Sequence, residues 1–436
     1  MFYNVVKRKI KNYFKHTMFA LIKLMVNLLR RNIYCMMWTI LAVILMLIIC
    51  LNFQREDNPT HAVPLLVWWT SSFPGTTQIR FCLNNVKCNV VSDHENINVS
   101  EVDAFLFYGS NLDFDNLPLP RRPKDVIWGL YHEESPRNVE ELMHLELLEL
   151  FNYSSTFSEH SDVPFPLQYL DSFDDITNSK YFVPTTIKNG FKNISAVMYL
   201  QTDCETATER DEYVKELMKY IQVDSYGTCL KNKDMPTRFT MDYLNNLNDD
   251  SFLRFIARYK FVLAIENGVC DDYVTEKFWR AIKTGTVPIY FGSPTIRHWL
   301  PNEKSAILLE DYPSPKVMSE HIKKLVDNDS LYETYLEHKT QKLISNKKLL
   351  DEFRLRPYQL DALEVVKKFE CLICEKVHDK RSGIIETKMV NNYHYNCPKP
   401  VSALTLQVNP SNNWVFSWYD SKFRAKEINK RVMNKI

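Results

Sequence analysis

The stretch "ENGVCDDYVTEKFWRAIKTGTVPIYFGSP", from Glu266 to Pro294, decides how this chain folds. The apolar run that leads into it, "YKFVLAIEN", predicts a buried strand that ends at Glu266 and Asn267. "DYVTEKFWRAIKTG" then predicts a helix that ends at Gly285, and "TVPIYFGSP" predicts the next strand. Strands that alternate with helices form parallel sheets, and ligands bind at the carboxyl ends of such strands. The loop after Asn267 is therefore expected to face a ligand.

The same alternation extends along most of the chain. It indicates an α/β protein with two Rossmann-like domains, joined by the polar, turn-rich residues 172–190. We expect an N-terminal Rossmann-like domain over residues 63–180, a ligand-binding domain over 181–350 and a C-terminal segment over 351–436. Expected strands lie within 64–70, 88–93, 102–109, 125–136, 195–204 and 223–227, and expected helices span 137–151 and 208–221.

Length and charge narrow the class of protein. At 436 residues the chain is long enough for two domains. Its net charge of +1 is unevenly distributed along the chain, because residues 1–31 hold eight of the 54 Lys and Arg and no Asp or Glu. The remainder carries 46 basic residues against 53 acidic ones, which argues against a nucleic-acid groove.

The run "IYCMMWTILAVILMLIICL", Ile33 to Leu51, is long and apolar enough to predict one transmembrane helix. We expect a cytosolic basic tail over residues 1–31, a signal-anchor over 32–52 and a stem over 53–62. The positive-inside rule then places the body of the protein in the lumen. A cleaved signal peptide is the alternative, which is disfavoured because the run starts late and lacks a small-residue cleavage site.

A lumenal body predicts disulfides and glycans. Eight cysteines follow the apolar run, and sequons occur at Asn98, Asn152, Asn193 and Asn328. The pair Cys371 and Cys374, with Cys397 further on, is compatible with half a zinc site, a redox motif or structural disulfides. We favour disulfides, because a zinc site needs four ligands and no second CxxC is present.

The helix that begins near Thr275 predicts a phosphate site. A helix N-terminus offers free backbone N–H groups and a positive dipole end, and Lys277 adds a cation in the first turn. Glu276 is suited to accept ribose hydroxyls or to orient Lys277. The alternative is a capped surface helix with a salt bridge between Glu276 and Arg280.

Two further clusters carry candidate chemistry. In "HEESP", His132 to Pro136, a carboxylate at the end of a strand is placed to act as a general base toward a ligand held by the second domain. Capping of the following helix is the alternative. Arg210, early in its predicted helix, is either a phosphate ligand or a solvated surface residue.

The combination of "FVLAIEN", "DDYVTEKFWRA" and "VPIYFGSP" resembles the signature of the α-1,3-fucosyltransferases, glycosyltransferase family 10. "HEESPRNVEEL" looks closer to one branch of that family, the protein O-fucosyltransferases. The resemblance implies a GT-B fold, with the two domains facing across a cleft, and inverting transfer from GDP-fucose. It also implies no bound cofactor and no structural metal. The branch implies Ser or Thr hydroxyls of EMI domains as acceptors, whereas the broader family fucosylates GlcNAc in glycans.

The resemblance also assigns roles to individual residues. Glu134 matches the proposed catalytic base. Thr202 and Asp203 stand where the family has Ser-Asn, which puts their hydrogen bonds to the donor in doubt. Residues placed at donor-binding positions are Thr202, Asp203, Arg210, Lys231, Asn267, Tyr273, Glu276 and Lys277.

For the cysteines, the resemblance implies the disulfides Cys82–Cys371 and Cys88–Cys374, with a vicinal Cys371–Cys374 bridge as the alternative. The pairing of Cys204, Cys229, Cys270 and Cys397 stays open. We expect a single-pass type II protein of the Golgi or endoplasmic reticulum membrane. A binding protein without activity and a transferase for another nucleotide sugar remain as alternative functions.

Overall fold

The computed structural model describes residues 17–25, 40–46, 63–70, 73–74, 77–92, 94–95, 97–121, 125–239, 249–384, 386 and 388–433. Residues 1–63 and 64–436 form two separate units. In the first unit, residues 17–25 and 40–46 are helical, and the rest of the predicted signal-anchor lies outside the described residues. Among the described residues, no helix is both long and apolar enough to cross a bilayer.

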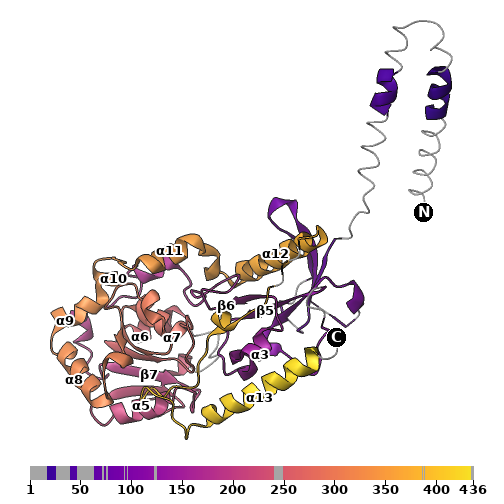
Figure 1. Cartoon of the computed structure of the whole chain (residues 1–436). Coiled ribbons are helices and arrows are strands. Elements are labelled where there is room, and N and C mark those ends of the chain that lie inside the picture. Colours follow the sequence, from indigo (N-terminus) through magenta and orange to yellow (C-terminus); the bar gives the residue numbers. More distant parts are fainter. Residues whose placement is uncertain are drawn as a thin grey trace. The chain divides into compact units, whose positions relative to one another are not determined.

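The second unit contains two sheets that are almost entirely parallel (Figure 1), which confirms the α/β class. The first sheet has the order β2-β3-β1-β4-β5-β6, and only the edge strand β2 runs antiparallel to its neighbour. Its strands are β1 (Leu65–Trp68), β2 (Gln78–Phe81), β3 (Lys87–Val91), β4 (Ala104–Tyr108), β5 (Ile127–His132) and β6 (Tyr153–Thr156).

The second sheet has the order β11-β10-β9-β7-β8 and is parallel throughout its described pairs. Its strands are β7 (Val197–Gln201), β8 (Val223–Gly227), β9 (Phe261–Ile265), β10 (Val287–Phe291) and β11 (Ile307–Leu308). β7 to β10 lie where the sequence predicts strands. The polar strands β2 and β6 were not predicted, because neither carries a run of apolar residues.

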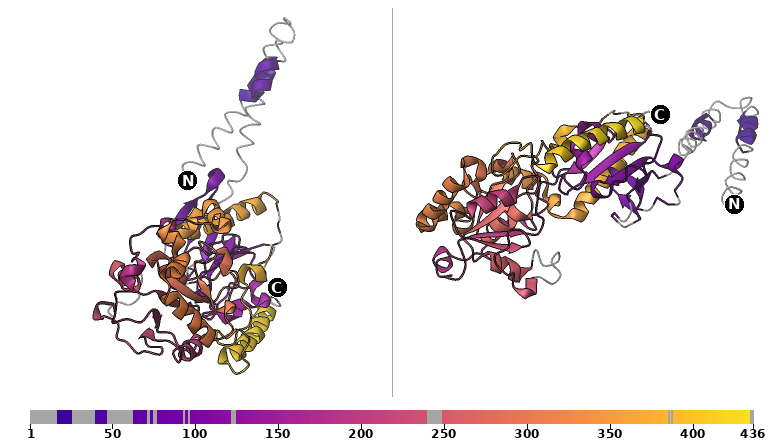
Figure 2. Two further views of the ribbon diagram at one scale, coloured as in Figure 1. Left: turned by 90° about the vertical axis from the view of Figure 1, so that its left-hand side faces the viewer. Right: turned by 90° about the horizontal axis from the view of Figure 1, so that it is seen from below.

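Helices α12 (Ala362–Arg381) and α13 (Asn413–Met433) cover opposite faces of the first sheet (Figures 1 and 2). Alternate residues of each strand point to opposite faces. Accordingly Leu106 packs with Phe369 of α12, while Phe105 and Phe107 belong to the core that includes Ala425 of α13. The C-terminal segment thus completes the N-terminal domain.

The second sheet also has helices on both faces. Helices α5 (Arg210–Leu217) and α8 (Pro315–Val326) share one core, and α6 (Asp250–Ile256) and α7 (Glu276–Thr284) cover the other face. The shorter and peripheral helices are α3 (Leu145–Leu148), α4 (Thr185–Lys188), α9 (Asp329–Glu333), α10 (Glu337–Thr340) and α11 (Lys347–Leu355), with 3-10 turns between many elements.

The predicted helix over residues 137–151 is wrong in its extent. The chain forms a 3-10 turn, Glu140–Met143, and the single α-helical turn α3. His144 between them is extended, and its ring Nε2 lies 2.8 Å from the Ser421 hydroxyl of α13. Packing against α13 therefore overrides the helical period of this stretch.

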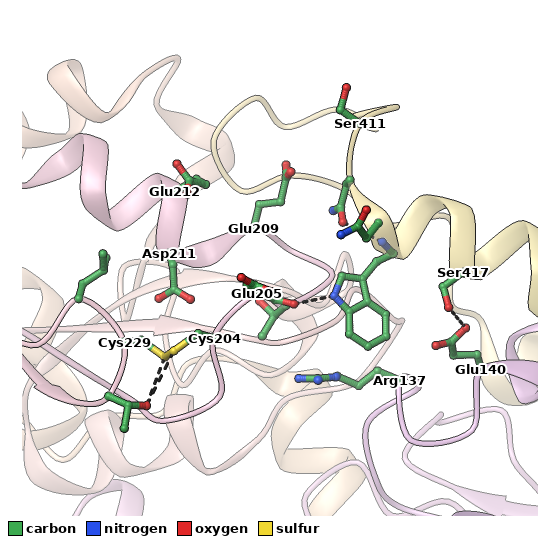
Figure 3. Close-up of a pocket in the computed structure, with 16 residues that line it drawn as sticks. Arg137, Glu140, Cys204, Glu205, Glu209, Asp211, Glu212, Cys229, Ser411 and Ser417 are labelled. Carbon is green, nitrogen blue, oxygen red and sulfur yellow. Dashed lines mark hydrogen bonds between the residues drawn. A yellow bond between two sulfur atoms is a disulfide. The ribbon is translucent and has the colours of Figure 1, made fainter.

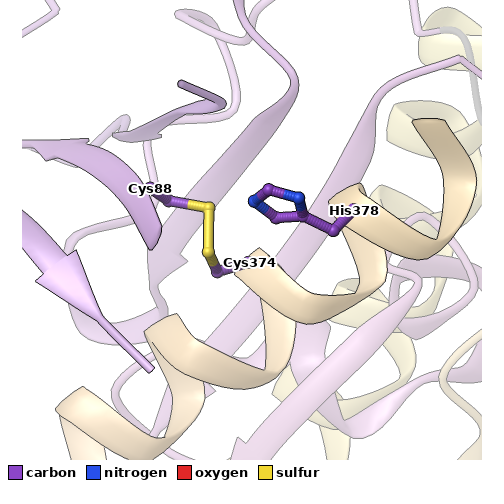
Figure 4. Close-up of side chains that lie close together, drawn as sticks. All are labelled: Cys88, Cys374 and His378. Carbon is purple, nitrogen blue, oxygen red and sulfur yellow. A yellow bond between two sulfur atoms is a disulfide. The ribbon is translucent and has the colours of Figure 1, made fainter. Parts of the chain in front are cut away.

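All eight cysteines that follow the apolar run form disulfides. Cys82–Cys371 and Cys88–Cys374 confirm the predicted pairs and exclude the vicinal bridge. His378 lies beside the second of them (Figure 4), but both sulfurs are bonded to each other, so this group offers no thiolate to a metal. The pairs left open by the sequence are Cys204–Cys229 and Cys270–Cys397.

One predicted glycosylation site is incompatible with the folded structure. Asn152 is 5% exposed. Its side-chain oxygen accepts hydrogen bonds from Arg121 Nη2 and from the Trp128 backbone, and its Nδ2 donates to the Lys388 carbonyl. A glycan on this nitrogen would remove a buried hydrogen bond and find no room. Asn98, Asn193 and Asn328 are exposed.

We therefore expect glycans at Asn98, Asn193 and Asn328 and none at Asn152 when the protein passes through a glycosylating compartment. Intact-mass and glycopeptide analysis before and after peptide N-glycosidase treatment measures the occupancy of each site. Replacing Asn152 with Gln should leave the glycan mass unchanged. Stoichiometric glycosylation of Asn152 would contradict its buried position.

Candidate active site

The loop between β9 and α7 is organised around the buried carboxylate of Glu266. This side chain is fully buried and accepts hydrogen bonds from the Thr275 backbone N–H at 2.8 Å and from Thr275 Oγ1 at 2.8 and 3.0 Å. Thr275 in turn caps α7, which ends at Gly285 in the left-handed conformation, with φ of 65°. The helix boundaries predicted from the sequence are confirmed.

Glu266 reduces the number of backbone N–H groups that the start of α7 can offer to a phosphate. The Thr275 N–H is occupied by Glu266, and the Lys277 N–H is directed to Thr275 Oγ1 at 3.4 Å. The expectation of free N–H groups at this helix end is therefore only partly met. The ammonium of Lys277 is the main cationic group that this helix end offers.

Lys277 lies between two carboxylates, 3.2 Å from Glu266 and 3.3 Å from Glu276. Burial lowers the pKa of Lys277, but Glu266 and Glu276 raise it by more, so the ammonium stays charged. Burial raises the pKa of Glu276, whereas Lys277 and Arg280 bring it down to about 2. Arg280 also forms the predicted salt bridge with Glu276 at 3.3 Å. These four side chains thus form a network of charged groups that is largely shielded from solvent.

Two carboxylates follow β5 at the edge of the first sheet. Glu133 Oε1 accepts a hydrogen bond from Tyr108 at 2.9 Å, and burial raises the pKa of Glu133 to about 7. Burial also raises the pKa of Glu134, with Glu276 acting in the same direction and Lys277 against it. Glu134 is therefore electrostatically coupled to the network on α7, and a raised pKa suits a general base.

Asn267 joins the loop after β9 of the second sheet to the loop after β5 of the first sheet. Its side-chain oxygen accepts a hydrogen bond from Ser135 Oγ, in the turn after β5, at 2.9 Å and lies 3.4 Å from the Tyr273 hydroxyl. Tyr273 is 3% exposed. The structure thus brings Glu134, Asn267, Tyr273, Glu276 and Lys277 into one region between the carboxyl ends of β5 and β9.

Arg210, the first residue of α5, is buried. Its guanidinium donates to the backbone carbonyls of Asp203 at 2.5 Å and Ile265 at 3.3 Å. The surface alternative is therefore wrong, because this side chain ties the loop after β7 to the end of β9. Direct contact of Arg210 with a phosphate stays a prediction.

Asp203 lies in an ion-pair network. Its carboxylate pairs with Arg137 and is 3.8 Å from Arg210. Thr202 precedes it on the exposed loop, where the Thr202 carbonyl accepts a hydrogen bond from Thr228 Oγ1 at 2.8 Å. Lys231 pairs with Asp234 at 2.8 Å.

Several residues of this region were not predicted. Glu266, Ser135 and Arg137 lie within the quoted motifs, and the position of Glu266 at the end of a buried strand was an available signal. Tyr395, which lies 3.5 Å from the Glu134 carbonyl, carried no such signal. A pocket of about 720 Å³ lies between the loop after β7 and the start of α13 (Figure 3), and its lining includes Arg137, Glu205, Asp211 and Trp414.

Glu133 provides a test of the electrostatics. Its pKa in the fold, about 7, lies above the ordinary value of 4.5, so its stabilising contribution is complete below pH 4.5 and is lost as pH rises through 7. We expect Glu133→Gln to flatten this part of the stability profile. Thermal unfolding between pH 4.5 and 8 measures it, with the exposed Glu320→Gln as control. Parallel profiles for wild type and Glu133→Gln would contradict the assignment.

The chain is similar to known proteins of one family. The model of "Fucosyltransferase, N-terminal" matches residues 61–168, and that of "Glycosyltransferase family 10 (fucosyltransferase) C-term" matches residues 191–393. The chain is 39% identical to human GDP-fucose protein O-fucosyltransferase 3 over 394 residues, covering 87% of this chain and 81% of the relative. It is 41% identical to α-(1,3)-fucosyltransferase B of Drosophila melanogaster over 362 residues, covering 81% and 80%.

Among solved structures, a crystal structure of an α1,3-fucosyltransferase is similar with 16% identity and a TM-score of 0.41, covering 70% of this chain and 91% of that one. The family models and the relatives define the class of protein, a glycosyltransferase with two α/β domains. The chain belongs to glycosyltransferase family 10, the fucosyltransferases.

Proposed function

We propose that this protein transfers L-fucose from GDP-fucose, with inversion at the anomeric carbon, to Ser or Thr hydroxyls of EMI-type protein domains. The observation that carries the proposal is the coupling of Glu134, at the edge of one sheet, to the Lys277 network of the other. A base and a phosphate-binding cation on opposite sides of one site are what an inverting transferase needs. The name of the human relative supports GDP-fucose as donor and protein as acceptor.

In the proposed reaction, the acceptor oxygen attacks C1 of fucose while the bond from C1 to the β-phosphate oxygen breaks. Glu134 takes the hydroxyl proton, which later passes to solvent. The transition state has oxocarbenium character. Negative charge grows on the departing GDP, and the Lys277 ammonium stabilises it. No step requires a bound metal.

The roles of the remaining residues follow from their positions. Glu276 is held with its carboxylate charged, so it can accept ribose hydroxyls as a hydrogen-bond acceptor. Asn267 and Tyr273 lie at the junction of the sheets, where we place the fucose end of the donor. Arg210 supports the donor through the loop after β7. Thr202 lies on the same loop, and Lys231 pairs with Asp234.

A second candidate is α-1,3-fucosylation of GlcNAc in N-glycans, which the name of the Drosophila relative favours. The decisive experiment incubates the purified full chain with GDP-fucose and, in parallel, with folded EMI domains and with N-glycans. We expect transfer to the EMI domain, and NMR of the product should show inversion. Transfer only to glycans would select the second candidate, and transfer to neither would favour a binding protein.

We also propose that the protein is a type II membrane protein of the Golgi or endoplasmic reticulum. Four disulfides and three exposed sequons support an oxidising, glycosylating compartment for the body. The basic residues before the apolar run support a cytosolic N-terminus. Protease protection of sealed microsomes tests the orientation.

A further inference from the structure

Residues 394–414 lie beyond the region matched by the C-terminal family model, which ends at residue 393. They nevertheless contact the loops that form the candidate active site. Tyr395 lies 3.5 Å from the Glu134 carbonyl. Cys397 is bonded to Cys270 in the loop before α7, and the Asp271 N–H donates to the Asn396 carbonyl at 3.0 Å. This C-terminal segment is therefore built into the site.

The same segment holds the loop after β7, residues 202–209, along most of its length. Ala403 and Asn412 bond backbone groups of this loop, the former through its N–H to the Thr208 carbonyl at 2.7 Å. Asn409 bonds the Glu209 carboxylate at 2.8 Å. Trp414 Nε1 donates to the Glu205 carbonyl at 2.6 Å. The conformation of this loop thus depends on a segment about 200 residues later in the chain.

Trp414, in the first turn of α13, also contacts the first domain. The guanidinium carbon of Arg137 lies 4.6 Å from the centre of the Trp414 ring, a cation–π arrangement. The same guanidinium pairs with the Asp203 carboxylate. Trp414 therefore touches both the loop after β7 and the residue that neutralises the acid on that loop.

The charge of Asp203 makes this contact important. Asp203 lies next to Arg210, and its side chain is 44% exposed. A carboxylate there repels a diphosphate unless a cation is paired with it. Arg137 is the nearer of the two cations that face it, since Arg210 lies 3.8 Å away. Stacking on an indole fixes the plane of a guanidinium and limits its other orientations. Without Trp414, the Arg137 side chain would lose its indole contact and keep its ion pair with Asp203.

We propose that Trp414 is a positioning residue for the donor: it holds Arg137 against Asp203 and fixes the loop after β7, so that the site accepts the diphosphate of a nucleotide sugar. The proposal deepens the function proposed above and rests on it for the nature of the donor. The C-terminal segment is then a functional part of the donor site.

The test measures GDP binding by isothermal titration calorimetry, together with KM and kcat for GDP-fucose, on the full chain. Trp414→Ala is expected to weaken GDP binding by about 10-fold or more, from the loss of a partly buried cation–π contact and one hydrogen bond. We expect KM to rise more than kcat falls. Phe416→Ala is the matched control, because Phe416 lies on the same helix and is 62% exposed.

A merely structural role is separated by rescue. Because Trp414 acts by keeping the Asp203 charge neutralised, adding Asp203→Asn to Trp414→Ala should restore most of the GDP affinity. Trp414→Phe, which keeps an aromatic face but lacks the indole N–H, should fall between wild type and Trp414→Ala. If Trp414→Ala fails to fold, Trp414→Phe alone and with Asp203→Asn provides the same comparison.

GDP affinity in Trp414→Ala equal to that in Phe416→Ala would overturn the proposal. A loss of affinity that Asp203→Asn leaves unchanged would also overturn it, since Trp414 would then fix the loop after β7 without acting through Arg137 and the charge of Asp203. A wild-type protein that binds GDP but transfers no fucose would refute the proposed function and leave this inference standing, because its readout is GDP binding.

Discussion

Replacing Glu134 with Gln is expected to lower fucose transfer by about 10²–10⁴-fold, the usual contribution of a general base. The amide keeps the shape of the carboxylate but cannot take the proton of the acceptor hydroxyl. GDP binding should persist, because Glu134 contributes no positive charge to the phosphate site. Initial rates with a saturating acceptor, together with calorimetric GDP titration, measure both effects.

The neighbouring Glu133 supplies the matched control for this substitution. Glu133→Gln changes the adjacent carboxyl group, whose Oε1 is already engaged by the Tyr108 hydroxyl at 2.9 Å. It should therefore lose much less activity than Glu134→Gln. If Glu134→Gln turned over at a rate close to that of wild type while Glu133→Gln did not, Glu133 would be the base and the assignment to Glu134 would be wrong.

Replacing Lys277 with Met is expected to impair both donor binding and stability. The substitution keeps the length of the side chain but removes the cation between Glu266 and Glu276. Breaking a buried ion pair by removing one partner typically costs about 3–5 kcal/mol, because the remaining charge is left without compensation. Denaturant unfolding measures the free energy of unfolding, and calorimetry measures GDP affinity.

A double variant separates the two effects of Lys277. Glu266→Gln combined with Lys277→Met removes the fully buried unpaired charge, so part of the lost stability should return while GDP affinity stays low. Lys219→Met is the control for losing a surface lysine, since the Lys219 side chain is 62% exposed and pairs with Glu216, three residues earlier in the chain. Recovery of GDP binding in the double variant would show that Lys277 acts on the fold and not on the donor.

Local patterns in the sequence predicted the strands β7 to β10 and the helices α5 and α7 of the second domain, but not β11, α6 or α8. The runs that became β7, β9 and β10 are short, mostly apolar and bounded by turns, and the short, more polar β8 ends at Gly227. Helix α7 is capped by Thr275 and ends at Gly285. These features act between residues a few positions apart, so they can be read along the chain. The positions of the motif residues between β9 and α7 could therefore be predicted from the sequence.

Features that depend on distant partners could not be predicted in this way. The run over residues 137–151 has a helical period, yet α13 holds His144 in an extended conformation from 277 positions away. Asn152 is a sequon in the sequence and a buried hydrogen-bonding group in the fold. Sequence spacing contains no information about which side chain will occupy the space opposite, and this is the physical reason for both errors.

The sequence by itself determined the α/β class and, through the family resemblance, two of the four disulfides, whereas the role of Glu134 stays a prediction. Only the tertiary structure decided that the Glu266 carboxylate bonds the Thr275 N–H at the start of α7 and that Arg137 pairs with Asp203. It also decided that residues 394–414 contact the loops that follow β5, β7 and β9. Each of these contacts joins groups on different elements. Their energies depend on burial and on the approach of opposite charges, which arise only when the two sheets and the C-terminal segment pack together.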